Sequence, residues 1–375
     1  MTKRTGFICD ESYFWHDTGN AALVMPPGGW IEADVHAENP ATKRRFKNLM
    51  ERSGLMKQLV QIAPRSATVE EIQLYHGKEY IDKVRELSEI GHGDAGKGAL
   101  VGKGSYEIAL LSAGGAITAV EAVVNGQVDN AYALTRPPGH HAESDFGMGF
   151  CLFNNVAVAA KHARKNLGIE KVLVLDWDVH HGNGTESAFY DDPDVLFISL
   201  HQERNYPPGR GKAEDIGSGK GKGYNINIPL PAGTGNAGYM YALKEIVAPI
   251  TDQFKPNLIL ISAGQDPSLF DPLARMMVTA EGFRQMARFM LNIAEKHCGG
   301  KFIACHEGGY SSAYVPFCSH AIVEEMSGVS TEVEDPFAQS MHEIPTDELF
   351  DIQKEYVKRV KEIQSKFWTL PSVVF

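Results

Sequence analysis

Cysteine is scarce in this sequence, and no two cysteines have the spacing of a disulfide framework or of a cysteine-bound zinc site. The 375 residues include five scattered cysteines, an odd number, and no CxxC pair. Disulfide scaffolds and cysteine-bound zinc sites both need cysteines paired at characteristic spacings. We therefore expect free thiols in a reduced compartment, with the cytoplasm as the location. The cysteines are Cys9, Cys151, Cys298, Cys305 and Cys318.

The sequence also lacks an excess of positive charge and a long apolar segment. The formal net charge is −11, whereas phosphate binding needs a basic face, so nucleic acid is not expected as a partner. The basic run KRR at 43–45 is interpreted as a solvated helix face. MTKRTGFICD at the N-terminus has no apolar core of a secretory signal, and no uninterrupted apolar run is long enough to cross a bilayer. A membrane is therefore not expected as a partner either.

Helical and strand patterns alternate from about residue 105 onward. The strands are apolar runs without polar alternation, which is typical of strands covered on both faces. This alternation predicts an α/β fold in a single domain, a mainly parallel sheet with helices on both faces. The predicted helices are 105–124, 154–168, 237–254 and 280–297, and the predicted strands are 131–135, 171–176, 195–200, 257–263 and 301–305.

Four polar motifs each follow one of these strands. RPPGHH comes after AYALT, DWDVHHGNG after KVLVL, GQD after LILISA, and HEGGY after KFIAC. In open parallel sheets, ligands bind beyond the carboxyl ends of the strands. The four motifs are therefore expected to meet at one edge of the sheet and to form a single site.

Asp178, His180 and Asp266 are the candidate metal ligands. The first two are two positions apart, a spacing that places both side chains on the same side of an extended chain. The third follows a neighbouring strand. Two carboxylates and an imidazole suit zinc, or iron(II) in its place, and three protein ligands leave a coordination position open for catalysis.

His140 and His141 are the candidate proton-transfer groups, because two adjacent histidines lie on a loop stiffened by two prolines. Each imidazole needs a partner that fixes its tautomer, and Asp176 and Asn183 are the candidates for that role. Tyr310 follows two glycines in HEGGY. Its phenol is a neutral donor that could stabilise a developing oxyanion.

These residues lie in motifs that resemble those of the histone deacetylase and acetylpolyamine amidohydrolase superfamily. RPPGHHAE, GFCLFNN, DWDVHHGNGT, DPLARM and EGGY occur in the family's order, and the resemblance covers about residues 5–330. HAENPATKRRF near the start and DPLARMMVTAEGFRQMA at 271–287 are most similar to the bacterial histone deacetylase-like amidohydrolases of the class II type. We interpret 1–375 as one catalytic domain with a helical tail at about 340–367.

The resemblance implies an arginase-like α/β fold, one zinc ion per chain on the three ligands named above, and structural potassium. It implies that the histidine pair transfers protons and that the tyrosine polarises the acyl carbonyl. The residues that it assigns to potassium are Asp176, Asp178, His180, Ser199 and Leu200 at one site, and Phe189, Asp192, Val195 and Tyr224 at a second. Those that it assigns to the acyl-lysine tunnel are Phe150, Tyr206, Gly149 and Gly308.

The expected activity is hydrolysis of an acetylated lysine-like amine to acetate and free amine, with hydroxamates as expected inhibitors. The resemblance also implies a homo-oligomer, a dimer or tetramer. Three alternatives remain: a deacylase for acetylpolyamines or other small amides, a two-manganese ureohydrolase, and a non-catalytic acyl-lysine-binding module. Asn183 replaces the aspartate of class I members, Gln265 replaces an aromatic residue, and Tyr206 replaces the more frequent phenylalanine. The last two are expected to narrow or polarise the pocket.

Overall fold

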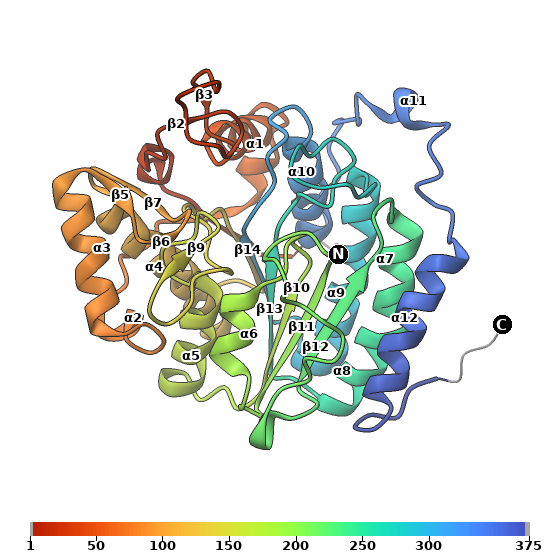
Figure 1. The fold of residues 1–375 in the computed structure, drawn as a ribbon. Helices are drawn as coiled ribbons and strands as arrows, with labels where there is room; N and C mark the ends of the chain where they lie inside the picture. Colours follow the sequence, from red (N-terminus) through yellow and green to blue (C-terminus); the bar gives the residue numbers. More distant parts are fainter. Residues whose placement is uncertain (1–2, 372–375) are drawn as a thin grey trace.

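A computed structural model describes residues 3–371, and its centre is an eight-stranded sheet (Figure 1). The strand order is β12-β11-β10-β13-β14-β8-β1-β4, and every neighbouring pair is parallel, as predicted. The strands are β1 Thr5–Ile8, β4 Val60–Ile62, β8 Asn130–Ala133, β10 Val172–Asp176, β11 Val195–Gln202, β12 Asn225–Leu230, β13 Leu258–Ala263 and β14 Phe302–His306.

Helices cover both faces of the sheet (Figure 1). On one side lie α2 Val69–Ile72, α3 Lys78–Ile90, α4 Ser105–Val124, α5 Asn155–Asn166 and α6 Asn183–Phe189; on the other lie α1 Ala41–Arg52, α7 Asn236–Ala242, α8 Ala248–Phe254, α9 Ala280–Cys298, α10 Val315–Ser327 and α12 Asp351–Gln364. The predicted helix 237–254 is α7 and α8 joined by a π-helical turn, Leu243–Val247. A short helix, α11 Ala338–Met341, precedes α12.

Helix α4 is long and apolar enough to cross a bilayer by length and composition. However, 67% of its apolar window is buried inside the protein, where α4 packs against α5, β8 and β1. Burial of this kind is what the core helix of a globular α/β domain requires. We therefore interpret α4 as a core helix.

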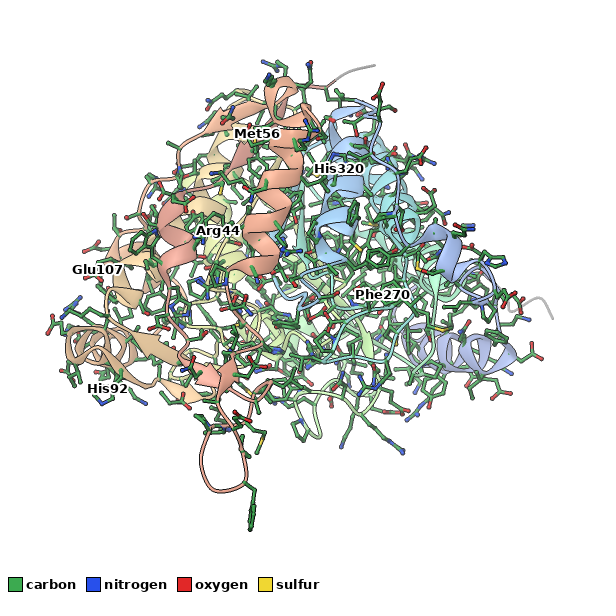
Figure 2. The ribbon with its side chains drawn as sticks, turned by 90° about the horizontal axis from the view of Figure 1, so that it is seen from above. Arg44, Met56, His92, Glu107, Phe270 and His320 are labelled. Carbon is green, nitrogen blue, oxygen red and sulfur yellow. The ribbon has the colours of Figure 1, made fainter. Side chains whose placement is uncertain are left out.

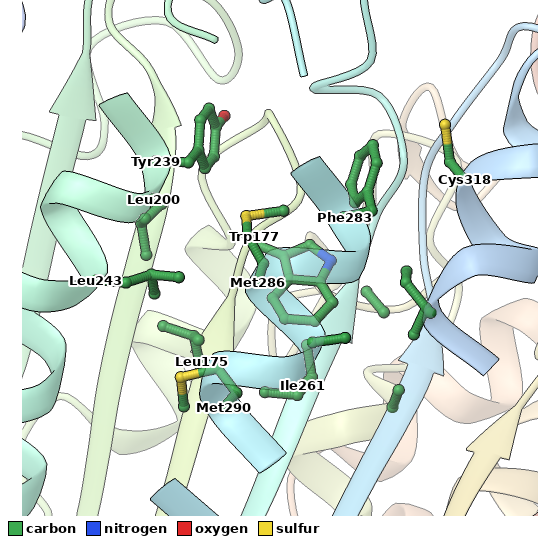
Figure 3. Packing of buried hydrophobic residues seen from close by; sticks show 14 of the residues in the cluster. Leu175, Trp177, Leu200, Tyr239, Leu243, Ile261, Phe283, Met286, Met290 and Cys318 are labelled. Atoms are coloured by element: carbon green, nitrogen blue, oxygen red, sulfur yellow. The ribbon is translucent and has the colours of Figure 1, made fainter. Parts of the chain in front are cut away.

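The continuous apolar strands have a simple cause, because alternate residues enter two separate cores. In β10, Leu173 and Leu175 join the core on the α9 side, and Val172 and Val174 join the core on the α4 side. Just beyond β10, Trp177 is fully buried beneath α9 (Figure 3). This packing fixes the position of the chain directly before the predicted metal ligands.

Small satellite structures lie outside the central sheet, most of them in the segment before β8. These are η1 Glu11–Trp15, η2 Leu55–Gln58, the pair β2 Asn20–Ala21 and β3 Asp34–Val35, the pair β5 His92–Asp94 and β7 Leu100–Gly102, and the pair β6 Gly96–Lys97 and β9 Gly147–Met148. The turn η3 Gly219–Gly221 lies before β12.

Helix α1 packs along α10, with Arg44 on the first helix and His320 on the second (Figure 2). The sequence interpretation of KRR as a solvated face is wrong for its first residue. Arg44 is exposed, but Lys43 is buried, and its Nζ lies 3.1 Å from Oε1 of Glu38. A charged side chain can be buried in this way when it is paired with an opposite charge.

Candidate active site

The four motifs meet at one edge of the sheet because their strands are aligned in register. Asp176 at the end of β10 pairs with Ser262 of β13, and Ala263 pairs with His306 of β14. β8 lies beside β14, and the RPPGHH loop follows it. The chain therefore delivers all four motifs to the same place, which confirms the expectation drawn from the strand ends.

Asp178, His180 and Asp266 form a buried cluster that could hold a metal ion, and one ligand atom from each lies within 4.8 Å of the others. Nδ1 of His180 is 3.1 Å from Oδ1 of Asp178 and 3.1 Å from Oδ2 of Asp266. Oδ2 of Asp266 is buried and accepts no well-directed hydrogen bond, although Nδ1 of His180 lies beside it. A buried carboxylate oxygen without such a bond is costly, and a divalent cation would satisfy it.

Backbone amides and a close-packed glycine hold these carboxylates in place. The backbone N–H of Val179 donates to Oδ1 of Asp266 at 2.8 Å, and that of Gly308 donates to Oδ2 of Asp178 at 2.8 Å. A Cβ atom at position 308 would lie 2.2 Å from Oδ2 of Asp266. Gly308 therefore packs directly against the candidate metal ligands. It lies beneath the tunnel to which the family resemblance assigned it.

The two histidines of the RPPGHH loop each have a partner that orients the ring. Nδ1 of His140 lies 2.9 Å from Oδ2 of Asp176, and Nδ1 of His141 lies 2.8 Å from Oδ1 of Asn183. Asn183 in turn donates from Nδ2 to Oε1 of Glu143 at 2.8 Å. Because the amide nitrogen is engaged by a carboxylate, the amide oxygen faces His141, which places the histidine proton on Nδ1 and leaves Nε2 as an acceptor.

Burial and neighbouring charges shift the pKa values of the two histidines in opposite directions. Burial disfavours a charge on His140, but the carboxylates of Asp178 and Asp176 outweigh it and raise its pKa to about 10. Burial and the positive charge of His140 lower the pKa of His141 well below its usual range. The two rings lie side by side, with ring centroids 3.9 Å apart, and the opposite pKa shifts favour a proton on His140 over one on His141.

Three carboxylates near the site were not singled out from the sequence. Glu143 orients Asn183 as described, and Oε2 of Glu307 accepts the backbone N–H of Gly139 at 2.6 Å. Oδ2 of Asp271 accepts the backbone N–H of Tyr310 at 2.7 Å. All three lie inside quoted motifs, RPPGHHAE, HEGGY and DPLARM, so an ionisable residue within a motif was the available signal.

A cavity of about 380 Å³ leads from the surface to the cluster, and Tyr310, His141 and His180 line it. Burial, followed by the charges of Asp266 and Asp178, raises the pKa of Tyr310 well above its usual range, so its phenol is a neutral donor. The other lining residues are Val24, Lys97, Gly98, Gly149, Phe150, Asn205, Tyr206 and Leu273.

The predicted tunnel residues Phe150, Tyr206 and Gly149 line this cavity, whereas Gln265 does not. The expectation that Gln265 narrows or polarises the pocket is therefore wrong. Its amide lies outside the cavity and donates to the backbone oxygen of Ala263 at 2.6 Å. At position 149, φ is +51° and a Cβ would lie 2.4 Å from Cδ2 of His141, so only glycine fits there.

The residues assigned to potassium gather at two places. Asp176 pairs with Ser199 across β10 and β11, next to Asp178 and His180. At the other end of β11, the backbone N–H of Asp192 donates to the oxygen of Phe189 at 3.1 Å. The second group is completed by Val195 at the start of β11 and by Tyr224, whose oxygen accepts the N–H of Phe197.

Comparison with known proteins gives a consistent result. The histone deacetylase domain family matches residues 36–326. A histone deacetylase-like amidohydrolase of Pseudomonas aeruginosa is 46% identical, with 99% of this chain and 98% of that protein covered. A probable deacetylase of Archaeoglobus fulgidus is 37% identical, with 97% and 98% covered. The crystal structure of the HDA15 HD domain has a TM-score of 0.86 at 32% identity and covers 98% of this chain and 96% of that chain.

Proposed function

The chain belongs to the histone deacetylase family and is a hydrolase of amide bonds, and from this premise we propose that it removes acetyl groups from lysine-like amines. The products would be acetate and the free amine. The observation that carries the proposal is the convergence of the Asp178–His180–Asp266 cluster, the histidine pair and Tyr310 on one cavity.

The donor set of the cluster fits zinc, with iron(II) as the alternative. Two carboxylates and one imidazole would hold a single ion, and the buried oxygen Oδ2 of Asp266, which accepts no well-directed hydrogen bond, supports this assignment. When bound, such an ion supplies Lewis-acid polarisation of the acyl carbonyl and makes water more acidic. A two-manganese centre would need further bridging carboxylates, whereas Asp176 already pairs with His140.

The remaining chemistry is assigned to side chains of the chain itself. His141, with Nε2 as an acceptor, would take a proton from the attacking water. The positive charge on His140 and the phenol of Tyr310 would stabilise the negative charge that develops on the carbonyl oxygen. One histidine of this pair, protonated at that stage, would then deliver its proton to the leaving amine nitrogen, so that a neutral amine departs.

The aromatic residues that line the cavity fit the apolar methylene chain of a lysine-like substrate. Phe150 and Tyr206 offer ring surfaces along it, and the Phe150 ring lies 5.8 Å from that of Tyr310. Phe150 has φ of +70°, a left-handed conformation that is strained for a bulky residue. Strain of this kind is typical of functional sites, where it places a side chain that an ordinary backbone would not.

We further propose two structural potassium ions at the residue groups described above and a homo-oligomeric assembly in the cytoplasm. Exposed apolar side chains on the arm formed by residues 19–36 support the assembly. Trp30 at its tip is fully exposed, and Met25 and Val35 are also exposed. Isolated apolar residues are common on surfaces, but a cluster on a projecting arm favours a protein contact.

Replacing Tyr310 by phenylalanine tests the proposal. We expect Tyr310→Phe to bind metal and a hydroxamate as the wild type does, but to lose about 100- to 1,000-fold in kcat on an acetyl-lysine peptide, because one oxyanion donor is removed. The control is Tyr241→Phe, on the remote surface of α7. Near wild-type turnover in Tyr310→Phe would contradict the assignment.

Metal analysis and a substrate panel separate the alternatives. One transition-metal ion per chain supports the deacetylase, and two support the ureohydrolase. Rates on an acetyl-lysine peptide, on N-acetylputrescine and on longer acyl amides distinguish the substrate classes. A metal-loaded protein that binds the hydroxamate but hydrolyses none of these amides would be a binding module.

A further inference from the structure

The rim of the catalytic cavity carries one permanent positive charge. Lys97 is exposed and lines the cavity together with the neutral residues Val24, Asn205 and Leu273. Within the part of the chain that the structure describes, no carboxylate is among the residues that line this cavity. A substrate that enters therefore meets a cation at the surface, although the protein as a whole has a net charge of −11.

The loop that carries Lys97 is held in a defined conformation. Asp94 accepts three backbone N–H groups within it, those of Gly96, Gly98 and Ala99, at 2.8 to 2.9 Å. The carboxylate of Asp94, which is the negative charge nearest in sequence to Lys97, therefore stabilises the loop. Charge-assisted bonds of this kind are stronger than neutral ones, so they fix the loop geometry.

The same loop is joined to the tunnel wall. The pair β6–β9 places Lys97 opposite Met148, and the oxygen of Lys97 accepts the N–H of Gly149 at 3.1 Å. The next residue, Phe150, donates its N–H to the oxygen of Gly98 at 2.8 Å. The ammonium group of Lys97 lies 4.7 Å from the ring centroid of Phe146. Backbone pairing therefore holds Lys97 at the entrance, and a cation–π contact fixes its ammonium group over the neighbouring Phe146.

The substrate class proposed above places its own charge near this position. In an acetyl-lysine peptide, four methylenes separate the amide nitrogen from Cα, so the peptide backbone and the flanking side chains lie at the rim. In N-acetylputrescine, four methylenes separate the amide nitrogen from an ammonium group, which would occupy the place of Cα. Lys97 would attract a neighbouring carboxylate and repel that ammonium.

We propose that Lys97 is a specificity-determining residue, which selects acyl-lysine substrates with an acidic group next to the acyl-lysine and disfavours acylated polyamines. This inference rests on the proposed deacetylase function. It assigns the cavity a preference for anionic or neutral peptides, and it separates the two substrate classes that the family resemblance leaves open.

The test uses two acetyl-lysine peptides that differ only in the flanking residue, aspartate or lysine. For the wild type, we expect kcat/KM to be roughly two- to fivefold higher for the aspartate peptide at low salt, the size of an exposed charge pair. The ratio should approach one in Lys97→Met, which keeps an apolar stem, and should invert in Lys97→Glu. Because each ratio is measured within one variant, a loss of folded protein cancels.

Lys103→Glu is the matched control, because Lys103 is an exposed lysine whose Nζ donates to the backbone oxygen of Glu89, away from the cavity. It changes the net charge as Lys97→Glu does and should keep the wild-type ratio. Raising the salt from about 0.05 to about 1 M should shrink the wild-type preference.

An unchanged ratio in Lys97→Glu, or faster hydrolysis of N-acetylputrescine than of both peptides by the wild type, would overturn the inference while leaving the deacetylase function intact. No hydrolysis of either peptide by the metal-loaded wild type would instead overturn the proposed function, and the inference with it.

Discussion

The ionisable side chains at the cavity floor are each held by a neighbour that has no direct part in the chemistry. Asp176 and Asn183 orient the histidine pair, and Glu143 orients Asn183. Arg210 donates to the same oxygen of Glu143 at 2.8 Å, so the chain of contacts reaches the surface. Preorganised partners of this kind hold catalytic groups within a fraction of an ångström of their working geometry.

Gly308 is expected to be indispensable for metal binding. A Cβ there would lie 2.2 Å from Oδ2 of Asp266 and 2.7 Å from Oδ2 of Asp178, so Gly308→Ala must displace both carboxylates. We expect zinc affinity, measured by competition with a chelator, to fall roughly 10- to 100-fold. Gly77→Ala is the control, since its Cβ would meet nothing closer than 3.8 Å. Equal zinc affinity in the two variants would contradict this packing argument.

The cavity floor was predictable from the sequence, and the rim was not. Asp178, His180 and Asp266 lie directly after apolar strands. The carboxyl ends of parallel strands meet at one edge of the sheet, independently of the conformation of the loops. Lys97 reaches the rim through the short pairing of β6 with β9, and Val24 through a loop closed by the bridge between Leu23 and His36. Such loop contacts leave no periodic pattern in the sequence, so they become visible only in the structure.

Helix α9 is the element that supports the metal-ligand segment from below. Its buried side chains Met286 and Met290 pack around Trp177 and Ile261, on the face of the sheet that it covers (Figure 3). Because Trp177 immediately precedes Asp178, this packing couples the stability of the core to the position of the site.

Truncation of Met290 should therefore destabilise the whole fold. Met290 is fully buried, and Met290→Ala removes its contacts and leaves a cavity, which costs roughly 2–5 kcal/mol in the free energy of unfolding. Denaturant titration measures this. Arg288→Ala on the exposed side of the same helix should stay within about 1 kcal/mol, because its ion pair with Glu325 is a surface pair. Similar losses in both variants would show that the helix face is wrongly assigned.

At the scale of elements, long apolar or amphipathic segments were predicted well and short ones were missed. The helix 105–124 coincides with α4, and the strand 195–200 lies within β11. β1 and β4 have four and three residues and pair at the sheet edge, and their sequences carry too little pattern to be recognised. Their place is decided by tertiary pairing, in which β1 pairs with β8 and β4 pairs with β1.

One buried ion network ties the N-terminal segment to the rest of the molecule. Oε1 of Glu38 lies 2.9 Å from Nε of Arg136 and 3.1 Å from Nζ of Lys43. Arg136 also donates to the backbone oxygens of Tyr13 and His16, at 2.9 and 2.7 Å. Since Arg136 begins the RPPGHH loop, the network connects the first fifty residues to the loop that carries the histidine pair.

This network should make stability depend on pH in a defined direction. Burial would raise the pKa of Glu38, but Arg136 and Lys43 outweigh it and hold the pKa well below the ordinary value of 4.5. A carboxyl whose pKa is depressed in the folded state contributes stability above its ordinary pKa, and that contribution is lost as the pH falls below it. Wild-type unfolding free energy should therefore decline steadily below about pH 4.5.

The variant Glu38→Gln separates this carboxyl from all others. At pH 7 it leaves Arg136 and Lys43 buried without an anion, and we expect it to lose roughly 3–5 kcal/mol in the free energy of unfolding. Below about pH 4.5 the gap to the wild type should narrow, because the wild type loses the same contribution by protonation. Glu11→Gln, which removes an exposed partner of Arg44, should follow the wild-type curve throughout. Urea titrations from about pH 3 to 7 decide the matter: a constant gap would mean that the charge of Glu38 is not what holds the N-terminal segment to the RPPGHH loop.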